Sequence, residues 1–321
     1  MNVSMRDGYG KALSEIGSDK NIVVLCADLS DSTRAEWFRE KYPDRFVEVG
    51  VAEQNMAGIA AGMASLGKTV FISSFAAFNP GRNWDQIRVS ICYSNLNVKI
   101  QGCHAGITVG ADGATHQALE DIALMRCLPN MTVVVPCDAE EGRKATIESA
   151  KLKGPVYLRF ARENVPVLDK VPFKIGRAEV LRDGKDVAIV ACGIMVHAAL
   201  SAAEELAGQG IDAMVINNHT IKPIDRKTLV MAARKTGKVV TAEEHQVQGG
   251  MGSAVAEVLS VEYPVPMAFV GVKDLFGESG KPGELLDKYG LASRDIVGAV
   301  KRLGRHLPIN PKCCKGVSHN K

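Results

Sequence analysis

The chain has 321 residues, of which 46% are hydrophobic and 23% charged, the balance of an ordinary globular protein with room for two domains. Its net charge of +3 is small for this length and its Lys and Arg are scattered, which argues against a protein held to nucleic acid by phosphate attraction. No apolar run approaches the roughly 20 residues that span a bilayer, and the N-terminus lacks the apolar segment of a signal peptide. We therefore expect neither nucleic acid nor a membrane as a partner.

The eight cysteines form no C-x-x-C pair, and most lie in apolar runs. Buried free thiols in a reducing compartment are the simplest interpretation, so we expect a cytoplasmic protein. Cys313, Cys314 and His319 share a tail that begins at about residue 308. A metal site is conceivable there, but a frayed tail is favoured.

Apolar, β-rich runs alternate with helical patterns in the first half of the chain. The expected strands are 22–28, 69–73, 97–102, 132–136 and 156–160, and the expected helices are 53–66, 84–92, 117–127 and 139–151. Strands that alternate with helices indicate a mostly parallel sheet covered on both faces.

A stretch with little helical period, 165–176, predicts a linker, and the pattern restarts after it. The expected strands are then 187–192, 213–217, 239–242 and 266–270, and the expected helices are 195–208, 251–260 and 293–303. The fold class is therefore α/β, with two doubly wound domains at residues 1–172 and 173–307. Residues 308–321 are expected to be a disordered tail.

Two regions of the first half carry residues suited to chemistry. Glu53 starts a helix of small apolar residues, where a carboxylate is stabilised by the helix dipole, so a plain cap also explains it. The loop-like stretch 101–117 follows a strand and brings together His104, Asp112 and His116 among glycines. Loops at the carboxyl ends of parallel strands bind ligands in α/β sheets. The spacing does not support a metal site, and polar contacts to a hydroxylated substrate explain these residues at least as well.

The second half carries one further candidate, the run Gly249-Gly250-Met251-Gly252, which opens a helix. Its backbone amides could hold an anion, although a tight turn into a packed helix is the favoured interpretation. The sequence contains neither G-x-x-x-x-G-K-[ST] nor Gly-x-Ser-x-Gly, so neither a P-loop nor a serine-hydrolase elbow is supported.

Four segments, in this order, resemble thiamine-diphosphate enzymes: transketolases, deoxyxylulose-phosphate synthases and 2-oxoacid dehydrogenase β subunits. They are GVAEQNMAGIAAGMA (50–64), SSFAAFNPGRNWDQIR (73–88), HAGITVGADGATHQALEDIALMRCLPNMTVVVPCDAEE (104–141) and EEHQVQGGMGSAVAE (243–257). The resemblance covers about residues 5–307 and is to the C-terminal subunit of a split transketolase. It implies a pyrimidine-binding domain followed by a transketolase C-terminal domain.

The resemblance also implies cofactor contacts. Glu53 would be catalytic, by hydrogen-bonding nitrogen N1′ of the aminopyrimidine ring of thiamine diphosphate. Phe75 would stack on that ring with Ile72 and Phe78 flanking it, although Phe75 alone would be interpreted as a core aromatic. Asp28, in CADLSDST, would lie near cofactor and substrate.

Substrate contacts are implied in the same way. Ser32 matches a serine that contacts sugar phosphate. His104, also a catalytic candidate, would bond the oxygens at C1 and C2 of a ketose, and Asp112 the C2 hydroxyl. His116 and Arg162 would help to bind hydroxyls or phosphate, which suits the bidentate guanidinium of arginine.

The diphosphate-binding domain of the family carries Gly-Asp-Gly and, about 30 residues later, Asn-Asn, which hold the metal. No Gly-Asp-Gly occurs here, and Asn217-Asn218 has no such motif upstream. The ligands for Mg²⁺ or Ca²⁺ are therefore expected on an N-terminal partner subunit, with no metal ligand in this chain. The family implies a dimer of heterodimers, active only as a complex.

The substrate loop favours a transketolase, which transfers a two-carbon ketol unit between sugar phosphates, as in the pentose phosphate pathway. Deoxyxylulose-phosphate synthases have Arg where His104 stands, and dehydrogenase β subunits usually lack the Asp-Gly-x-Thr-His-Gln run. TIKPID (220–225) and EEHQVQGGMGSA look more like those two relatives, but we give them less weight because that domain is expected to be far from the chemistry. A non-catalytic assembly or regulatory subunit and a metal-dependent hydrolase are weaker alternatives.

Overall fold

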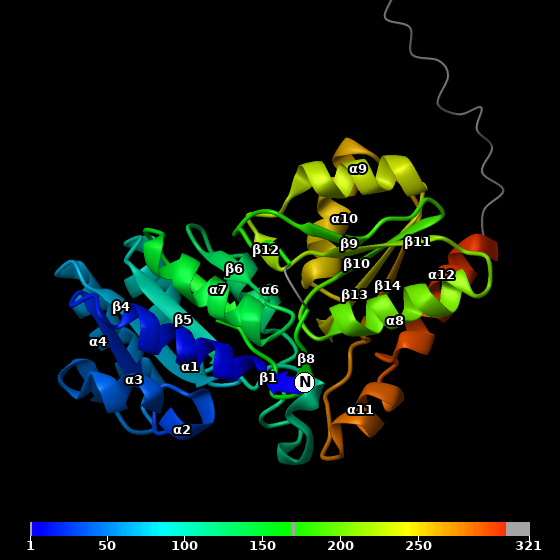
Figure 1. Cartoon of the computed structure of the whole chain (residues 1–321). Coiled ribbons are helices and arrows are strands. Elements are labelled where there is room, and N and C mark those ends of the chain that lie inside the picture. The colour runs from blue at the N-terminus through cyan, green and yellow to red at the C-terminus, as the bar shows by residue number, and fades with distance from the viewer. Residues whose placement is uncertain (1, 169–170, 306–321) are drawn as a thin grey trace, which may run out of the picture.

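A seven-stranded sheet forms the centre of the N-terminal half of the protein. The computed structural model describes residues 2–168 and 171–305 and shows two α/β lobes side by side (Figure 1). The first sheet has the strand order β12–β6–β7–β5–β4–β2–β3. Its strands are β2 (Ile22–Cys26), β3 (Phe46–Glu48), β4 (Thr69–Phe75), β5 (Val98–Cys103), β6 (Thr132–Val134), β7 (Val156–Arg159) and β12 (Thr220–Lys222). All run parallel except β12, which comes from the second half and pairs antiparallel with β6.

Helices cover both faces of this sheet because its strands are apolar on both sides. On β2, Val24 packs into the cluster that includes α1 (Met5–Ile16) and α7 (Ala139–Lys151), whereas Val23 and Leu25 pack into the cluster that includes α4 (Glu53–Ser65). Successive side chains of a strand point to opposite faces, so a continuous apolar run supplies two cores.

The C-terminal half repeats this layering around a five-stranded sheet of order β14–β13–β10–β11–β9. Its strands are β9 (Glu179–Arg182), β10 (Val187–Ala191), β11 (Ala213–Asn217), β13 (Val239–Gln246) and β14 (Met267–Val272). Only β9, an edge strand, runs antiparallel to its neighbour. Its covering helices are α8 (Met195–Ala207), α9 (Arg226–Thr236), α10 (Met251–Glu262) and α12 (Ser293–Arg305).

Short elements complete the fold. The helices are α2 (Ser30–Thr33), α3 (Glu36–Lys41), α5 (Trp84–Gln86), α6 (Asp121–Arg126), α11 (Pro282–Lys288), the 3₁₀ helices η1 (Pro43–Arg45) and η3 (Ile107–Asp112), and the π-helix η2 (Ile87–Tyr93). Strands β1 (Asn2–Ser4) and β8 (Asn164–Pro166) form an antiparallel pair. None of the described helices is long and apolar enough to cross a membrane.

The expected fold class, two doubly wound α/β domains, is confirmed, but several local expectations were wrong. Helix α1 was not foreseen, because its two glycines are poor helix formers. The helix expected at 84–92 changes from α5 into the π-helix η2, and the one expected at 117–127 begins only at Asp121. The first residues of the expected linker belong to β8.

The proposed domain boundary near residue 172 falls between β8 and β9 and remains a prediction. The tail at 308–321, with Cys313, Cys314 and His319, lies outside the described residues.

Candidate active site

Most of the candidate residues lie at or beyond the carboxyl ends of three neighbouring parallel strands. Strands β2, β4 and β5 are adjacent, with Leu25 opposite Ile72 and Phe75 opposite Cys103. Phe75 ends β4, and His104 directly follows β5. Because the carboxyl ends of parallel strands meet at one edge, residues far apart in the sequence come together there.

Four aromatic rings form a cluster at this edge. The ring centroids of Phe75 and His104 lie 4.1 Å apart at an interplanar angle of 27°. Phe78 lies 6.3 Å from Phe75 and 5.3 Å from His116. Phe75 is almost fully buried, whereas Phe78 and His116 are half-buried. The cluster therefore offers a partly open aromatic surface.

Glu53 is buried at the start of α4 and is tied to this cluster through Arg82. The Arg82 Nη1 donates to Glu53 Oε2 at 2.7 Å, and the same guanidinium lies 4.4 Å from the Phe78 ring centroid. Ser74 Oγ lies 3.5 Å from Glu53 Oε1. A buried carboxylate with an arginine and a hydroxyl as partners is more than a helix cap, because neither contact involves a backbone amide of α4.

His104 is held in its neutral form. Burial, followed by the positive charges of Arg6, Arg162 and Arg34, lowers the pKa of His104 to about 3. A neutral imidazole donates at one nitrogen and accepts at the other, so it can bond both a hydroxyl and a carbonyl oxygen. Its Nδ1 lies 3.1 Å from Cys103 Sγ, leaving the other nitrogen for a ligand.

The remaining polar candidates are held by two arginines whose charges act on His104. Arg162 Nη1 lies 3.7 Å from the Asp112 carboxylate and donates to the Val109 carbonyl at 2.7 Å. Both side chains are partly exposed, at 42% for Arg162 and 39% for Asp112, so a solute can reach them. Ser32 is placed by Arg6, whose Nη1 donates to the Ser32 carbonyl at 2.9 Å.

Among the described residues, the side chains of two candidates make no hydrogen bond or ion pair to this group. Ile72 is fully buried in the core beneath α4. Asp28 has a left-handed backbone at φ 57°, and its amide donates to Glu48 Oε1 at 2.7 Å. Their roles toward the cofactor remain predictions.

Three arginines at the site were missed by sequence reasoning. Arg6 and Arg34 reach the site from α1 and from the end of α2, and no local pattern marks either of them. Arg82 lies inside the resembling segment 73–88, and its spacing of four from Phe78 could have drawn attention to it. Arg6 and Arg34 are recognised only once the fold brings them to Ser32 and His104.

Comparison with known proteins agrees with this geometry. A family model for the pyrimidine binding domain of transketolase matches residues 1–167, and one for the transketolase C-terminal domain matches residues 176–296. The chain belongs to the transketolase family. The family implies dependence on thiamine diphosphate.

Individual members of the transketolase family match along nearly the whole chain. A 6-deoxy-6-sulfo-D-fructose transketolase subunit from Clostridium is 47% identical, covering 92% of this chain and 93% of the relative. A subunit of the apulose-4-phosphate transketolase from Phocaeicola vulgatus is 39% identical, covering 92% and 95%. A solved split gene transketolase, described as an inactive beta4 tetramer, is 53% identical with a TM-score of 0.88, covering 94% of this chain and 98% of that one. The chain therefore resembles the C-terminal subunits of split transketolases.

In this transketolase-family chain the glycine run 249–252 does begin a helix, α10, but its first amides are occupied by the protein itself. The amides of Met251 and Gly252 donate to the carboxyl group of Glu243 at 2.6 and 2.8 Å. The favoured interpretation, a turn into a packed helix, agrees with this contact.

Asn217 and Asn218 are fully buried, and Asn217 Nδ2 donates to Glu141 at 2.8 Å, which is a structural role. Among the described residues, no three His, Cys, Asp or Glu side chains are grouped to hold a metal.

Proposed function

We propose that this chain is the catalytic half of a transketolase, which transfers a two-carbon ketol unit from a ketose phosphate to an aldose phosphate. The observation that carries the proposal is the convergence of a buried carboxylate, an aromatic surface and neutral His104 at one edge of the first sheet. A subunit with only an assembly role would have no need of a buried carboxylate beside an open aromatic surface.

The residues present fit thiamine diphosphate. Phe75 and Phe78 offer an aromatic surface for the aminopyrimidine ring, and Glu53 is the carboxylate that would bond N1′. When bound, the cofactor supplies a nucleophilic thiazolium carbon and an electron sink. Because Glu53 now pairs with Arg82, that ion pair has to open or to share the carboxylate with the ring. Glu53 would then hold a proton at N1′.

The polar residues suit a ketose better than a 2-oxoacid. His104 and His116 donate and accept hydrogen bonds, and Asp112 accepts them, which matches several sugar hydroxyls. Pyruvate lacks these hydroxyls and would leave the buried His104 without a partner, at about 1–3 kcal/mol. The Asp112 carboxylate would also repel the carboxylate of pyruvate.

The positive charges of Arg6, Arg162 and Arg34 all act on His104, but Arg34 is already paired with two aspartates. We propose that Arg6 and Arg162 supply the positive charge for an anionic end of the sugar. The relatives named above act, by their names, on a sulfo sugar and on a sugar phosphate. We propose a phosphate in this position, in sugars of the pentose phosphate type.

We propose that a second chain supplies the diphosphate-binding domain and the ligands for Mg²⁺ or Ca²⁺. No Gly-Asp-Gly occurs in the 321 residues, and relatives of the same span are named subunits. Large apolar side chains are exposed on η2, at Val89 and Tyr93, and at the two ends of α4, at Val51 and Leu66. We propose that the partner docks over this part of the first domain. The assembly would be a cytoplasmic dimer of heterodimers.

The test compares donors in the assembled enzyme with thiamine diphosphate and Mg²⁺. We expect turnover of xylulose 5-phosphate, weaker turnover of unphosphorylated xylulose, and no efficient decarboxylation of pyruvate. Arg162→Ala should raise the KM for the phosphorylated donor more than for the unphosphorylated one. Efficient pyruvate decarboxylation with glyceraldehyde 3-phosphate as acceptor would instead assign the chain to deoxyxylulose-phosphate synthesis. An Arg162→Ala effect independent of the phosphate would remove Arg162 from the anion site.

A further inference from the structure

The loop that carries His104, Asp112 and His116 has an unusual backbone. His104 has φ 52°, and three glycines of the loop have φ between 73° and 91°: Gly106, Gly110 and Gly113. Left-handed backbone is costly for a residue with a side chain and persists only where surrounding contacts hold it. The loop therefore needs an external support to keep its candidate substrate residues in place.

Glu244, at the carboxyl end of β13 in the C-terminal domain, provides such a support. The Thr108 amide and the Thr108 hydroxyl both donate to Glu244 Oε1, each at 2.7 Å. At Gly106 a Cβ would lie 2.2 Å from Glu244 Cδ, so the carboxyl group packs directly against the loop backbone. One carboxylate thus fixes the conformation at two points of the loop.

The backbone of Glu244 is itself held by a buried arginine. Arg159 Nη2 donates to the Glu244 main-chain carbonyl at 2.8 Å, and Arg159 Nε donates to the Asp121 carboxylate at 2.8 Å. Glu244 is 2% exposed, and burial raises its pKa to about 7. Its bonds to Thr108 and the charge of Arg159 offset part of the cost of that burial.

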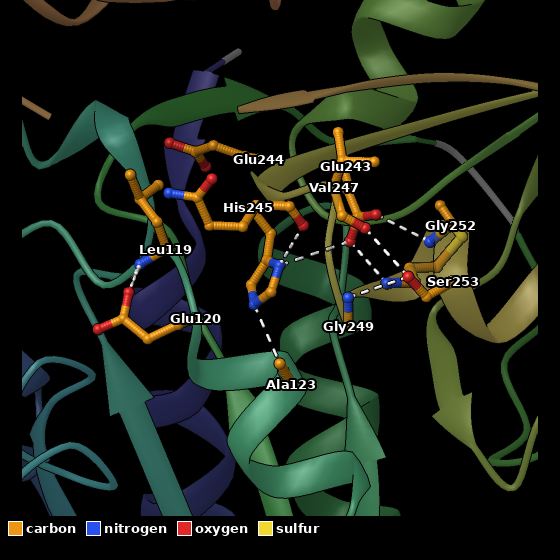
Figure 2. A network of polar contacts seen from close by, with 12 residues as sticks. Leu119, Glu120, Ala123, Glu243, Glu244, His245, Val247, Gly249, Gly252 and Ser253 are labelled. Atoms are coloured by element: carbon orange, nitrogen blue, oxygen red, sulfur yellow. Dashed lines mark hydrogen bonds and ion pairs between the residues drawn. The ribbon is translucent and has the colours of Figure 1, made fainter. Parts of the chain in front are cut away.

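The preceding carboxylate, Glu243, provides a natural contrast. Figure 2 shows Glu243 and Glu244 pointing to opposite sides of β13, as successive residues of a strand do. Glu243 bonds the amides that begin α10 within its own domain, whereas Glu244 bonds Thr108 in the other domain. Both are buried carboxylates of one strand, so only their partners differ.

We propose that Glu244 is a positioning residue, through which the C-terminal domain sets the geometry of the substrate loop. The expectation that this domain is far from the chemistry was wrong, because β13 contacts the loop directly. The structural part of the proposal concerns this chain alone, and its kinetic part rests on the proposed transketolase function.

The first experiment measures amide hydrogen exchange in the purified chain, which requires no activity. Glu244→Ala should speed exchange in residues 104–117, and Glu244→Gln should restore most of the protection because its amide oxygen still accepts from Thr108. Glu243→Ala, the matched control, should speed exchange at the start of α10 and leave 104–117 unchanged. Unchanged protection of 104–117 in Glu244→Ala would overturn the proposal.

The second experiment measures kinetics in the assembled holoenzyme. Glu244→Ala should lower kcat/KM for the ketose by up to about 10²-fold, because small displacements of binding groups are costly. Exchange of the thiazolium C2 proton should stay as in the wild type, since Glu53 is untouched.

Thr108→Val removes the hydroxyl from the loop side and keeps the proposal testable if Glu244→Ala does not fold. It should lower kcat/KM in the same direction, and the double variant should be no worse than Glu244→Ala alone. Full additivity of the two effects, or an unchanged kcat/KM in Thr108→Val, would contradict the proposed role. If the wild-type assembly had no transketolase activity but Glu244→Ala still sped hydrogen exchange in residues 104–117, only the proposed function would be contradicted.

Discussion

The two sheets of this protein are built alike, yet their carboxyl edges differ in what they leave available. At the first sheet, the residues beyond β4 and β5 include a partly open aromatic surface, and Asp112 and Arg162 are reachable from solvent. At the second sheet, the carboxylates at the end of β13 are buried and already bonded to Thr108 and to the amides of α10.

The difference between the two edges shows that a strand end followed by a glycine-rich turn is not sufficient to make a ligand site. The α10 amides bind an anion in geometry that resembles a phosphate site, but Glu243 occupies them. What distinguishes the first edge is that its carboxylate, Glu53, pairs with a half-exposed side chain, Arg82, instead of with the backbone. A partner of that kind can be displaced by a ligand.

The largest expected effect follows from exchanging a carboxylate at each edge. In the assembled enzyme, Glu53→Gln should slow exchange of the thiazolium C2 proton and turnover by about 10²–10⁴-fold, because the amide cannot hold the N1′ proton as a carboxyl group does. Glu243→Gln changes a buried carboxyl group of β13 that bonds the first amides of α10, and it should leave the exchange rate unchanged. Deuterium exchange followed by NMR measures both, and an unchanged rate in Glu53→Gln would make Glu53 a structural residue.

A smaller effect is expected from exposed carboxylates. Asp112→Ala should lower kcat/KM for a ketose phosphate by about 10–10²-fold, since a lost hydroxyl contact costs about 1–3 kcal/mol. Asp274→Ala removes an exposed carboxylate just beyond β14 at the other edge and should have no effect. If steady-state kinetics gave equal losses for both variants, the contrast between the two edges would fail.

At the carboxyl edge of the second sheet, where the carboxyl groups are buried, we expect substitutions to change the free energy of unfolding instead of catalysis. Glu243→Ala leaves two buried amides of α10 without an acceptor, so the free energy of unfolding should fall by about 1–3 kcal/mol. Denaturant titration of the purified chain would measure this loss. No loss of stability would mean that solvent satisfies those amides and that the edge is open after all.

One buried histidine at each edge should make the stability of the protein depend on pH. The pKa of His104 is lowered to about 3 and that of His245 to about 4, in both cases mainly by burial, whereas an unfolded histidine titrates near 6.5. Below pH 6.5 the unfolded chain therefore takes up protons at these two positions that the folded chain does not, so each histidine lowers the free energy of unfolding as the pH falls. The buried carboxyl groups of Glu243 and Glu244, whose pKa burial raises to about 7, act in the opposite direction, so the contribution of a histidine is read from the difference between wild type and variant.

Each histidine should cost about 2 kcal/mol at pH 5 relative to pH 7.5. His104→Asn and His245→Asn should each lose correspondingly less stability than the wild type over that interval. An equal loss in wild type and in His104→Asn would mean that His104 is solvated and that the first edge is more open than described.

Much of this fold is readable from the sequence where local and tertiary signals agree. The apolar run of β11 and the pattern of α7, with Asp138 capping it by accepting from the Glu141 amide, gave the right bounds. Helix α1 was missed because Gly8 and Gly10 disfavour a helix locally. A Cβ at Gly8 would lie 1.9 Å from the Ala139 carbonyl oxygen, so Gly8 allows α1 to pack closely against α7. That reason for a glycine cannot be read from the sequence of α1 alone.

Some residues of the candidate site could be predicted from the sequence, and others could not. Glu53, Phe75 and His104 stand in motifs that a resemblance could transfer, and they converge in the structure. Arg6 and Arg82 act through contacts made by folding, and Glu244 acts across two domains from position 244 to position 108. Strand β13 extends to Gln246, beyond the expected end at residue 242, because its last residues are charged and polar. They are buried there because their partners lie on other elements.

We propose that the open edge of the first sheet is catalytic only when a second chain completes it. Calorimetry with thiamine diphosphate and a coupled ketol-transfer assay should be run on this chain alone, on a candidate partner containing Gly-Asp-Gly and Asn-Asn, and on their mixture. We expect weak cofactor binding and no transfer by this chain alone, with tight binding and transfer in the mixture. Full ketol transfer by this chain alone would contradict this proposal.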